Sequence, residues 1–538
     1  MSLGTATGWP HWIVVPVVLP LVAGSLLLLL ERLRPAWVPA LSLLSTLALL
    51  TLAVQLMWQA QTGAVQAYLL GNWPAPFGIA LALDRLSALM LLLTALVAVC
   101  SLVYALGGDA ARGPHFHTLF QLQLMGLNGA FLTADLFNLF VFFEVLLAAS
   151  YGLLLHGDSE GRRARLKASV HYVTLNLAGS SLFLIAVALL YGLTGTLNMA
   201  DLAQKLPQLG PENSALLQAA ALMLLVVFAV KAALLPLYFW LPGTYAAATA
   251  PVAALFAIMT KVGVYAILRM TTLAFGPSGG AVAMVATPAL PVLALATLVL
   301  GAVGALSATR LRGLVAYLIV GSAGTLLLAV GLGTQGTVAA GLFYLVNSTL
   351  VAAVWFLLAD RVGAGRGGSD ALQPLAWSVG WAPLGIAFFV SAVAAAGLPP
   401  LAGFFGKVWL LQSAGAMPLA VWAVALVLGS SLVLLVALAR AGSVLFWEPA
   451  SAGTRAAGPA LRSSNAHGTR PAHALAIVAL LACLLGATVA AGPIASYAEA
   501  AAAQLFERQG YIAAVLGAQP LPAAFDVRRD MRERGGAK

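Results

Sequence analysis

Charged residues are scarce in this chain of 538 residues: 8% are Asp, Glu, Lys or Arg, whereas 62% are hydrophobic. The mean hydropathy is +0.98. A soluble domain could not hide so much apolar surface, and the apolar runs are longer than the roughly 10 alternating residues of a barrel strand. Helices satisfy their own backbone hydrogen bonds in lipid. The composition therefore predicts an all-α polytopic membrane protein.

Cysteines and nucleotide-binding motifs are also scarce or absent. Cys100 and Cys483 lie in apolar runs, which predicts small buried side chains instead of a disulfide or metal site. The sequence has no P-loop, dinucleotide fingerprint or His/Cys ligand spacing, so we expect no cofactor, no metal and no ATP or redox chemistry. We attribute the net charge of +10 to cytoplasmic loops and expect no nucleic-acid partner.

Apolar runs long enough to cross a bilayer need about 20 residues. The first run has no basic region before it, which predicts a retained span instead of a cleaved signal. Fourteen spans are predicted, at about 12–30, 36–58, 79–106, 117–134, 136–156, 168–194, 216–241, 246–273, 289–308, 314–332, 338–359, 376–411 (broken), 418–446 and 472–497.

The basic residues of the loops lie almost entirely on one side of these spans. With the N-terminus outside, fourteen Lys and Arg residues fall in inside loops and only Lys205 falls outside, as the positive-inside rule requires. The basic residues in 528–538 conflict with this, since fourteen spans place the C-terminus outside. We therefore expect an interfacial helix at 498–518, followed by a disordered end.

Four charged residues stand in the middle of apolar runs: Glu144, Lys231, Lys261 and Lys407. A charge at the centre of a spanning helix costs roughly 2.5–3.5 kcal/mol. We expect Glu144 to pair with a lysine and water to line the remaining charges, an arrangement that moves protons. The alternative is a structural ion pair that only fixes helix packing.

Two of the lysines stand beside helix-breaking prolines. Pro236 follows Lys231 by five residues, and Pro399 and Pro400 precede Lys407. A proline removes a backbone donor and frees carbonyl groups, and such backbone is tolerated at membrane depth only beside protein or water. We expect hydrated lysines, and two interrupted spans in separate halves of the chain indicate a repeat transporter.

The third lysine, Lys261, has hydroxyl groups near it in the sequence. Thr260 precedes it, and Tyr265 lies four residues on, hence on the same helix face. This spacing predicts a hydrogen-bonded relay around Lys261. Arg269 stands nearer the helix end, where we expect it to extend to the membrane surface.

These segments resemble a known family, the antiporter-like membrane subunits, which includes subunits of respiratory complex I and of Mrp-type cation/proton antiporters. The matching region covers about 80–445, and residues 144–156 resemble the D-type subunit of the Mrp antiporters, also called Mnh or Pha. The resemblance rests on these motifs: Phe142-Phe-Glu144; Lys231-Ala-Ala-Leu-Leu-Pro236; Met259-Thr-Lys261-Val-Gly-Val-Tyr265; Gly397-Leu-Pro-Pro-Leu-Ala-Gly-Phe-Phe-Gly-Lys407; and, for the D-type subunit, Gly71-Asn-Trp-Pro, Leu83-Asp-Arg-Leu-Ser87 and Tyr191-Gly-Leu-Thr-Gly.

The resemblance implies a fold and a set of partners. It implies N-terminal helices in 1–110, two inverted five-helix repeats in 111–275 and 286–446, and a C-terminal helix and tail in 447–538. It also implies that the seventh and twelfth helices are broken. The expected partners are the other subunits of an antiporter complex, protons, Na⁺ or K⁺ and the lipid of a bacterial plasma membrane.

By motif match, the resemblance assigns the essential glutamate to Glu144, its paired lysine to Lys231, the central relay lysine to Lys261 and the exit-side lysine to Lys407. The chain departs from its relatives on the eleventh span, where they often carry a histidine and then a lysine. Asn347 cannot titrate, so the relay from Lys261 onward needs bound water. The residues expected to hold that water are Tyr344, Asn347, Ser348 and Thr349.

We therefore expect a proton-translocating subunit of a multisubunit monovalent cation/proton antiporter, which is a secondary transporter and not an enzyme. The first alternative is a proton-pumping subunit of a complex I or membrane-bound hydrogenase type of enzyme, which genomic neighbours would distinguish. The second is a scaffold whose buried charges only lock helices together. Proton exchange that survives replacement of Glu144 and Lys231 would favour the scaffold.

Overall fold

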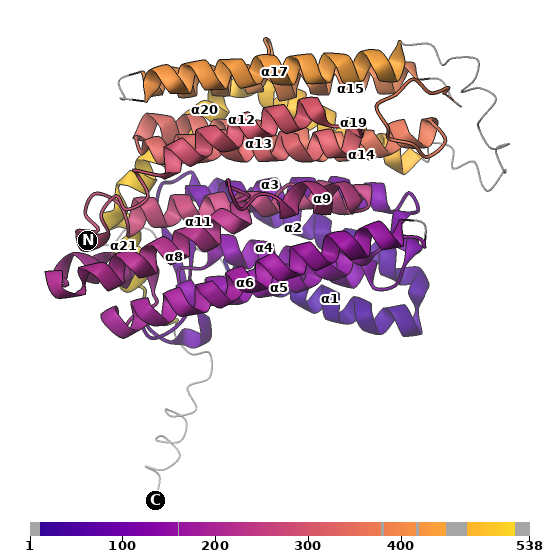
Figure 1. Cartoon of the computed structure of the whole chain (residues 1–538). Coiled ribbons are helices and arrows are strands. Elements are labelled where there is room, and N and C mark those ends of the chain that lie inside the picture. The colour runs from indigo at the N-terminus through magenta and orange to yellow at the C-terminus, as the bar shows by residue number, and fades with distance from the viewer. Residues whose placement is uncertain (1–10, 160, 378–380, 416–418, 448–470, 522–538) are drawn as a thin grey trace, which may run out of the picture.

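The computed structural model describes residues 11–159, 161–377, 381–415, 419–447 and 471–521. Most helices lie side by side and run between the same two ends of the molecule (Figure 1). Their bounds are α1 Val15–Leu33, α2 Val38–Ala60, α3 Arg85–Ala105, α4 Phe116–Leu132, α5 Leu136–Leu155, α6 Arg162–Thr194, α7 Met199–Lys205, α8 Ser214–Ala232, α9 Trp240–Ala247, α10 Ala250–Phe256, α11 Met259–Leu273, α12 Leu290–Ser307, α13 Leu311–Leu332, α14 Gln335–Gly365, α15 Ala382–Ala396, α16 Ala402–Ala414, α17 Ala420–Phe446, α19 Pro471–Val489, α20 Ala491–Phe506 and α21 Arg508–Leu516, with strands β1 Gln66–Leu69 and β2 Ala80–Leu83.

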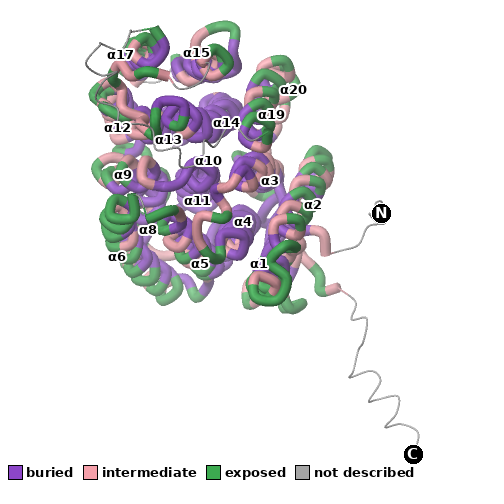
Figure 2. Tube along the Cα trace, turned by 90° about the vertical axis from the view of Figure 1, so that its right-hand side faces the viewer, coloured by how far each residue is buried: buried purple, intermediate pink, exposed green. Residues whose placement is uncertain are grey.

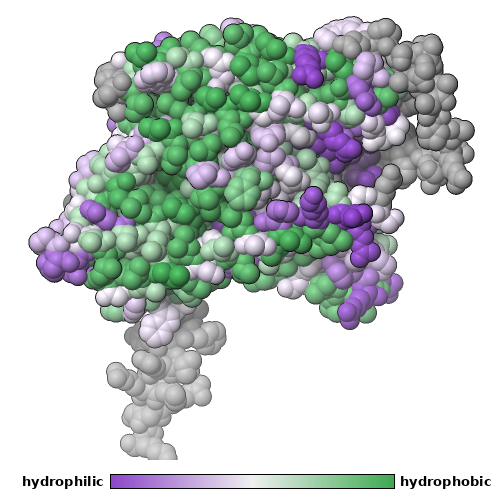
Figure 3. All heavy atoms as spheres, in the orientation of Figure 1, coloured by the Kyte–Doolittle hydropathy of each residue, from purple (hydrophilic) through white to green (hydrophobic). Residues whose placement is uncertain are grey.

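The predicted all-α polytopic fold is confirmed. In the part of the chain that the structure describes, 12 helices or helix pairs are long and apolar enough to cross a membrane. The 17-residue helix α4 and the broken pair α15 and α16 complete the fourteen predicted spans. Hydrophobic side chains cover the middle of the face in Figure 3, and hydrophilic ones gather towards the two ends of the helices.

The helices differ strongly in how far they are buried by the rest of the chain. Viewed along the helices, α10, α11, α13 and α14 are buried near the centre, and α1, α2, α6 and α17 are more exposed at the periphery (Figure 2). The spans 250–273 and 335–365 are 100% buried over their most apolar window, whereas that of α17 is 33% buried. The central helices are therefore surrounded by protein, which allows them to carry polar groups.

Small residues bring α12 and α13 into close contact. A Cβ atom added at Gly301 would lie 2.4 Å from the backbone nitrogen of Gly321. A Cβ atom added at Gly324 would lie 2.5 Å from the backbone nitrogen of Leu298. Glycines at such contacts let the backbones of membrane helices approach. This packing positions Ser322, which belongs to the site described below.

Side-chain caps begin several of the helices. The carboxylate of Asp84 accepts a hydrogen bond from the backbone nitrogen of Ser87 at 2.8 Å, and that of Asp135 accepts from Asn138 at 2.8 Å. Capping satisfies backbone donors that a helix leaves unpaired at its first turn. Asp135 therefore separates α4 from α5 as the cap of α5.

Two predicted spans differ from the structure in detail. The span expected at 79–106 begins only at α3, since residues 80–83 form β2 and pair antiparallel with β1. The span expected at 246–273 is interrupted at residues 257–258, between α10 and α11. An apolar run does not report such interruptions, because both sides of the break are equally hydrophobic.

The C-terminal helix also differs from its prediction. After α19, α20 packs against α14 and α3 and extends to residue 506. The backbone nitrogen of Arg85 donates to Oε1 of Gln504, and Nε2 of Gln504 donates to the carbonyl of Gly63, both at 2.9 Å. The helix expected at 498–518 is therefore divided, since residues 498–506 belong to α20, which packs on α14 and α3, and α21 follows it at Arg508–Leu516. The end expected to be disordered, 522–538, lies outside the described residues.

Candidate functional site

The four charged residues lie on four different helices. Glu144 is on α5, Lys231 is at the end of α8, Lys261 is on α11 and Lys407 is on α16. Figure 2 shows α5, α8 and α11 following one another towards α13 and α14, and α16 packs against α14. The lysines are buried, with 7%, 0% and 7% of their surface exposed, in chain order. Glu144, at the outer end of this series, is partly exposed.

Glu144 and Lys231 do not form the direct ion pair that we expected. Among the described residues, no carboxylate oxygen lies within 4.0 Å of the amine of Lys231, which donates instead to Oδ1 of Asn176 at 3.0 Å. Ser180 donates a hydrogen bond to Glu144. Asn176 and Ser180 are four residues apart on α6, so one helix face holds both charged groups. Glu144 and Lys231 are therefore connected through side chains of α6 and not through a direct ion pair.

The helix break beside Lys231 is present as predicted. Helix α8 ends at Ala232, and Ala233 adopts a left-handed conformation with φ of 56°. Pro236 stands in the segment before α9. The backbone nitrogen of Leu235 donates to Oγ1 of Thr297 at 2.9 Å, so a side chain of α12 satisfies part of the break. This contact ties the broken helix to the second half of the chain.

A small cavity lies beside Lys231. Its volume is about 10 Å³, which is close to the least that holds one water molecule. The wall formed by Met259 and Val262 belongs to α11, the helix of Lys261. A Cβ atom added at Gly263 would lie 2.4 Å from the backbone nitrogen of Ala232. The helices of the two lysines are therefore in direct contact at this cavity.

Lys261 is surrounded by hydroxyl groups. Its amine donates to Oγ of Ser322 at 3.3 Å and to Oγ1 of Thr260 at 3.5 Å. The predicted role of Thr260 as a neighbour of this amine agrees with the geometry. By the family resemblance, Ser322 stands where some relatives carry a histidine, and in the structure it is the contact that leads from α11 to α13.

The hydroxyl of Tyr265 does not bind the amine of Lys261, contrary to the expectation from the sequence. Its hydroxyl donates to the carbonyl of Phe131 at 2.8 Å and lies 3.3 Å from Arg269. Arg269 is 3% exposed and binds both carboxylate oxygens of Asp84, at 2.5 and 2.9 Å. The expectation that Arg269 extends to the surface was wrong, because a buried carboxylate on the residue that caps α3 satisfies it.

The amine of Lys407 lies at the second helix break, between α15 and α16. Its amine donates to the carbonyl of Ala396, the last residue of α15, at 2.8 Å, and to Oγ of Ser431 at 2.8 Å. Pro399 and Pro400 lie in the segment between α15 and α16. The lysine thus binds one of the carbonyl groups that the break frees, a contact that differs from the hydrated lysine expected from the sequence.

A second cavity joins the environments of Lys261 and Lys407. Its volume is about 30 Å³, enough for about two water molecules. Oδ1 of Asn347 is buried and has no hydrogen-bond partner in the described part of the chain. Thr349 does not line the cavity and donates to Leu345. The polar residues that line it are Ser322, Thr325, Tyr344, Asn347, Ser348, Trp355 and Lys407.

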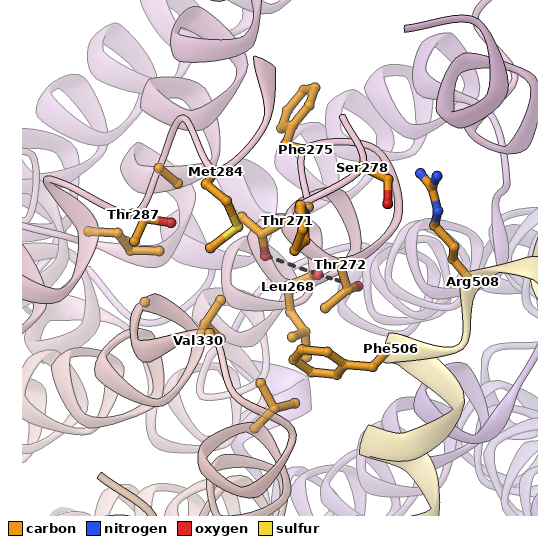
Figure 4. A pocket seen from close by; sticks show the side chains of 17 residues that line it. Leu268, Thr271, Thr272, Phe275, Ser278, Met284, Thr287, Val330, Phe506 and Arg508 are labelled. Atoms are coloured by element: carbon orange, nitrogen blue, oxygen red, sulfur yellow. Dashed lines mark hydrogen bonds between the residues drawn. The ribbon is translucent and has the colours of Figure 1, made fainter. Parts of the chain in front are cut away.

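A larger cavity lies apart from these residues. It has a volume of about 190 Å³ and is lined where α11, α13 and α20 end. Figure 4 shows Met284, Thr271, Thr272 and Phe506 around it, with Arg508 at one side. None of the four buried charges lines it. Cavity size therefore does not indicate the site here, whereas contact with the buried lysines does.

Sequence reasoning missed four hydrogen-bond partners: Asn176, Ser180, Thr297 and Ser431. Each is an uncharged polar residue within an apolar run, and such residues are common in spanning helices. The available signal was the spacing of Asn176 and Ser180 on one face of α6. Their partners lie on other helices, so the contacts themselves were not visible in the sequence.

The fold and the site define a class: a polytopic membrane protein with buried amines joined through hydroxyl groups and small cavities, and with helices broken beside two of those amines. A family model described as "NADH:quinone oxidoreductase/Mrp antiporter, TM" matches residues 133–433. The chain belongs to the family of D-type subunits of the Mrp-type cation/proton antiporters, and it is a multi-pass membrane protein.

Named relatives support this membership. The chain is 42% identical to the D subunit of a probable K(+)/H(+) antiporter of Rhizobium meliloti, over 93% of this chain and 96% of that one. It is 34% identical to the D subunit of a Na(+)/H(+) antiporter of Bacillus subtilis, over 94% and 99%.

Solved structures show the same fold. The structure of the Mrp complex from Dietzia sp. DQ12-45-1b contains a chain with a TM-score of 0.81, 29% identity, and coverage of 94% of this chain and 99% of that one. The membrane-bound sulfane sulfur reductase, an archaeal respiratory membrane complex, contains one with a TM-score of 0.82, 28% identity, and coverage of 94% and 99%.

Proposed function

We propose that this chain is the proton-translocating subunit of a multisubunit monovalent cation/proton antiporter in a bacterial plasma membrane. It acts as a secondary transporter: protons that move down their gradient drive the export of Na⁺ or K⁺. The observation that carries the proposal is the polar connection from Lys261 through Ser322 and the cavity of Asn347 to Lys407. A scaffold needs no unpartnered amide oxygen in a cavity between two buried amines.

In this proposal the proton path has three steps. Glu144 and Lys231 exchange a proton through water held beside Ser180 and Asn176, the side chains of α6 that bind them. Lys231 passes it to Lys261 across the cavity whose far wall is α11. Lys261 then delivers it to Lys407 through Ser322 and water at Asn347. Each step changes the charge beside the next amine, and the low dielectric of the interior makes neighbouring steps depend on one another.

The two halves of the chain support the proposed inverted repeats in 111–275 and 286–446. In each half the fourth spanning helix is the broken one, as α8 with α9 and as α15 with α16. The first part of each broken helix ends in a left-handed residue, Ala233 and Gly397. The break then stands beside a buried lysine, although Lys231 precedes its break and Lys407 follows its own.

The proposal is tested in inside-out vesicles that contain the complete complex, with a pH-sensitive dye and with NaCl and KCl compared. We expect Glu144→Gln and Lys231→Ala to reduce exchange at least about tenfold, since each removes a group that carries the proton. Lys205→Ala is the matched control, because Lys205 lies on α7 and pairs with Asp201. Full exchange by both site variants in assembled complexes would refute the assignment.

The alternative, a subunit of a respiratory enzyme complex, is favoured by one observation, the TM-score of 0.82 to the archaeal respiratory complex. The sequence relatives favour the antiporter instead, because those named above are antiporter subunits. Purification of the native complex separates the two functions. Co-purifying flavin or iron–sulfur subunits would indicate the enzyme, whereas co-purifying small membrane subunits would indicate the antiporter.

A further inference from the structure

One face of α6 carries a line of buried polar side chains that extends beyond the proposed site. Arg165, Ser169, Tyr172, Asn176 and Ser180 recur every three or four residues, which places them on the same side of the helix. All five are buried. Asn176 accepts a hydrogen bond from Lys231, and Ser180 donates one to Glu144. The others continue towards the start of α6, whose first turns are rich in Arg and Lys. By the positive-inside rule, this end faces the inner side of the membrane.

Tyr172 is the next group on this line inward from Lys231. Four helical residues rise about 6 Å, so its backbone lies one turn from that of Asn176. Its hydroxyl lies 2.9 Å from Oγ of Ser150 on α5, and its ring lines the cavity of Lys231. Further inward, Oγ of Ser169 is buried and has no hydrogen-bond partner among the described residues.

The surroundings on the opposite side of Lys231 are apolar. The ring of Phe143 lies 5.7 Å from the amine. It packs edge-to-face on Phe183, with centroids 5.8 Å apart, and Phe183 packs on Phe228 at 5.5 Å. Beyond Ser180, the next buried positions of α6 are Phe183 and Ala186, followed by Val187 and Leu190, which offer a proton no hydrogen bond.

We propose that the hydroxyl pair of Tyr172 and Ser150 is the gate through which protons pass between the inner side of the membrane and Lys231. The proton moves along the line by exchange between hydroxyl groups and water. In the structure Ser150 donates to the carbonyl of Leu147 at 2.7 Å, so Tyr172 is the donor to Ser150. Each hydroxyl accepts one proton as it gives up another, and both hydroxyl groups turn back before the next passage. The inference rests on the proposed function, because it assumes that Lys231 carries protons.

The gate is attached to the broken helix. The ring of Tyr172 stacks on Trp240, the first residue of α9, with centroids 5.0 Å apart and planes at 21°. Nε1 of Trp240 donates to the carbonyl of Val230 at 3.0 Å, on the turn that carries Lys231. A movement of the broken helix would therefore move Trp240, and Tyr172 would move with it. This links opening of the gate to the protonation state of Lys231.

The test uses two tyrosines that touch each other. Tyr172→Phe keeps the ring and its stack but removes the hydroxyl. Tyr151→Phe is the matched control, since its ring packs edge-to-face on Tyr172 at 5.1 Å. In vesicles with the complete complex, we expect Tyr172→Phe to lower exchange at least about tenfold and Tyr151→Phe to leave it unchanged. We expect Ser150→Ala to lower exchange and Ser150→Thr, which keeps a hydroxyl, to restore it.

A purely structural role predicts a different result. Loss of a gate raises the proton concentration needed for half-maximal exchange, whereas loss of packing lowers the amount of assembled complex and leaves that concentration unchanged. Equal exchange by Tyr172→Phe and wild type would overturn the gate, while loss of exchange in Lys231→Ala would still support the proposed function. Full exchange in Lys231→Ala would overturn the role of the lysine, and with it the gate.

Discussion

Replacement of Asn347 by leucine tests the connection between Lys261 and Lys407 most directly. The two side chains are nearly isosteric, so the change removes polarity with little change in volume. Oδ1 of Asn347 has no partner in the described chain, and Nδ2 makes only one long contact there, 3.5 Å to the carbonyl of Ala394. The side chain therefore contributes little to folding that leucine would lose.

We expect the substitution to change stability only slightly and to reduce transport strongly. Removing a buried polar group that is poorly paired changes the stability of the complex by at most about 1–2 kcal/mol, and the change can be favourable. Loss of the hydrogen bond that orders water in the cavity costs the proton transfer about 1–3 kcal/mol. Since about 1.4 kcal/mol is a factor of ten in rate, exchange should fall roughly fivefold to 150-fold.

The assay is cation-dependent proton exchange in vesicles, with thermal unfolding of the purified complex measured in parallel. Asn347→Ser is the control, because it keeps a hydrogen-bonding group and leaves more room for water; we expect it to retain exchange. Wild-type exchange by Asn347→Leu would show that protons reach Lys407 by another route. A large loss of stability would show that the amide is a packing element.

Contacts elsewhere in the structure support three further predictions. Gly397→Ala should reduce exchange, because Gly397 has φ of 75° and a Cβ atom there would lie 2.8 Å from Cδ of Lys407. The loss is measured as proton exchange in vesicles that contain equal amounts of the complex. Asp84→Asn should destabilise the complex by about 3–5 kcal/mol, because it leaves the buried guanidinium of Arg269 without its carboxylate; an unchanged melting temperature would contradict this. Burial lowers the pKa of His156, at the end of α5, so the folded chain disfavours its charged form. Stability should therefore fall as the pH drops below about 6.5, the value of an unfolded histidine, and His156→Gln should reduce that dependence in a pH series of melting curves.

Much of the site could be predicted from the sequence because charge in an apolar run is so costly. Lys231, Lys261 and Lys407 stand out by that cost alone, and the structure buries all three. Pro236 and Pro399 mark helix breaks, since proline cannot donate to a helix. These are properties of single residues and their immediate neighbours, so they are visible without a fold.

The partners of the charged groups could not be predicted in the same way. Glu144 and Lys231 were expected to meet, yet each binds an uncharged residue of α6. Tyr265 has the spacing of a partner for Lys261, but its hydroxyl is held by another helix. A helix face has several neighbours within reach, and only the packing of the helices decides which one a side chain meets.

By itself, the amino-acid sequence determined that this chain crosses a membrane many times, where two of its helices break and which four charged residues need internal partners. Each of these follows from the cost of placing a polar group in hydrocarbon, which applies residue by residue. The tertiary structure alone decided that α6 bridges Glu144 and Lys231, that Ser322 receives Lys261, and that a cavity at Asn347 replaces a titratable group. Those contacts join residues distant in the chain, and they arise only when the helices pack.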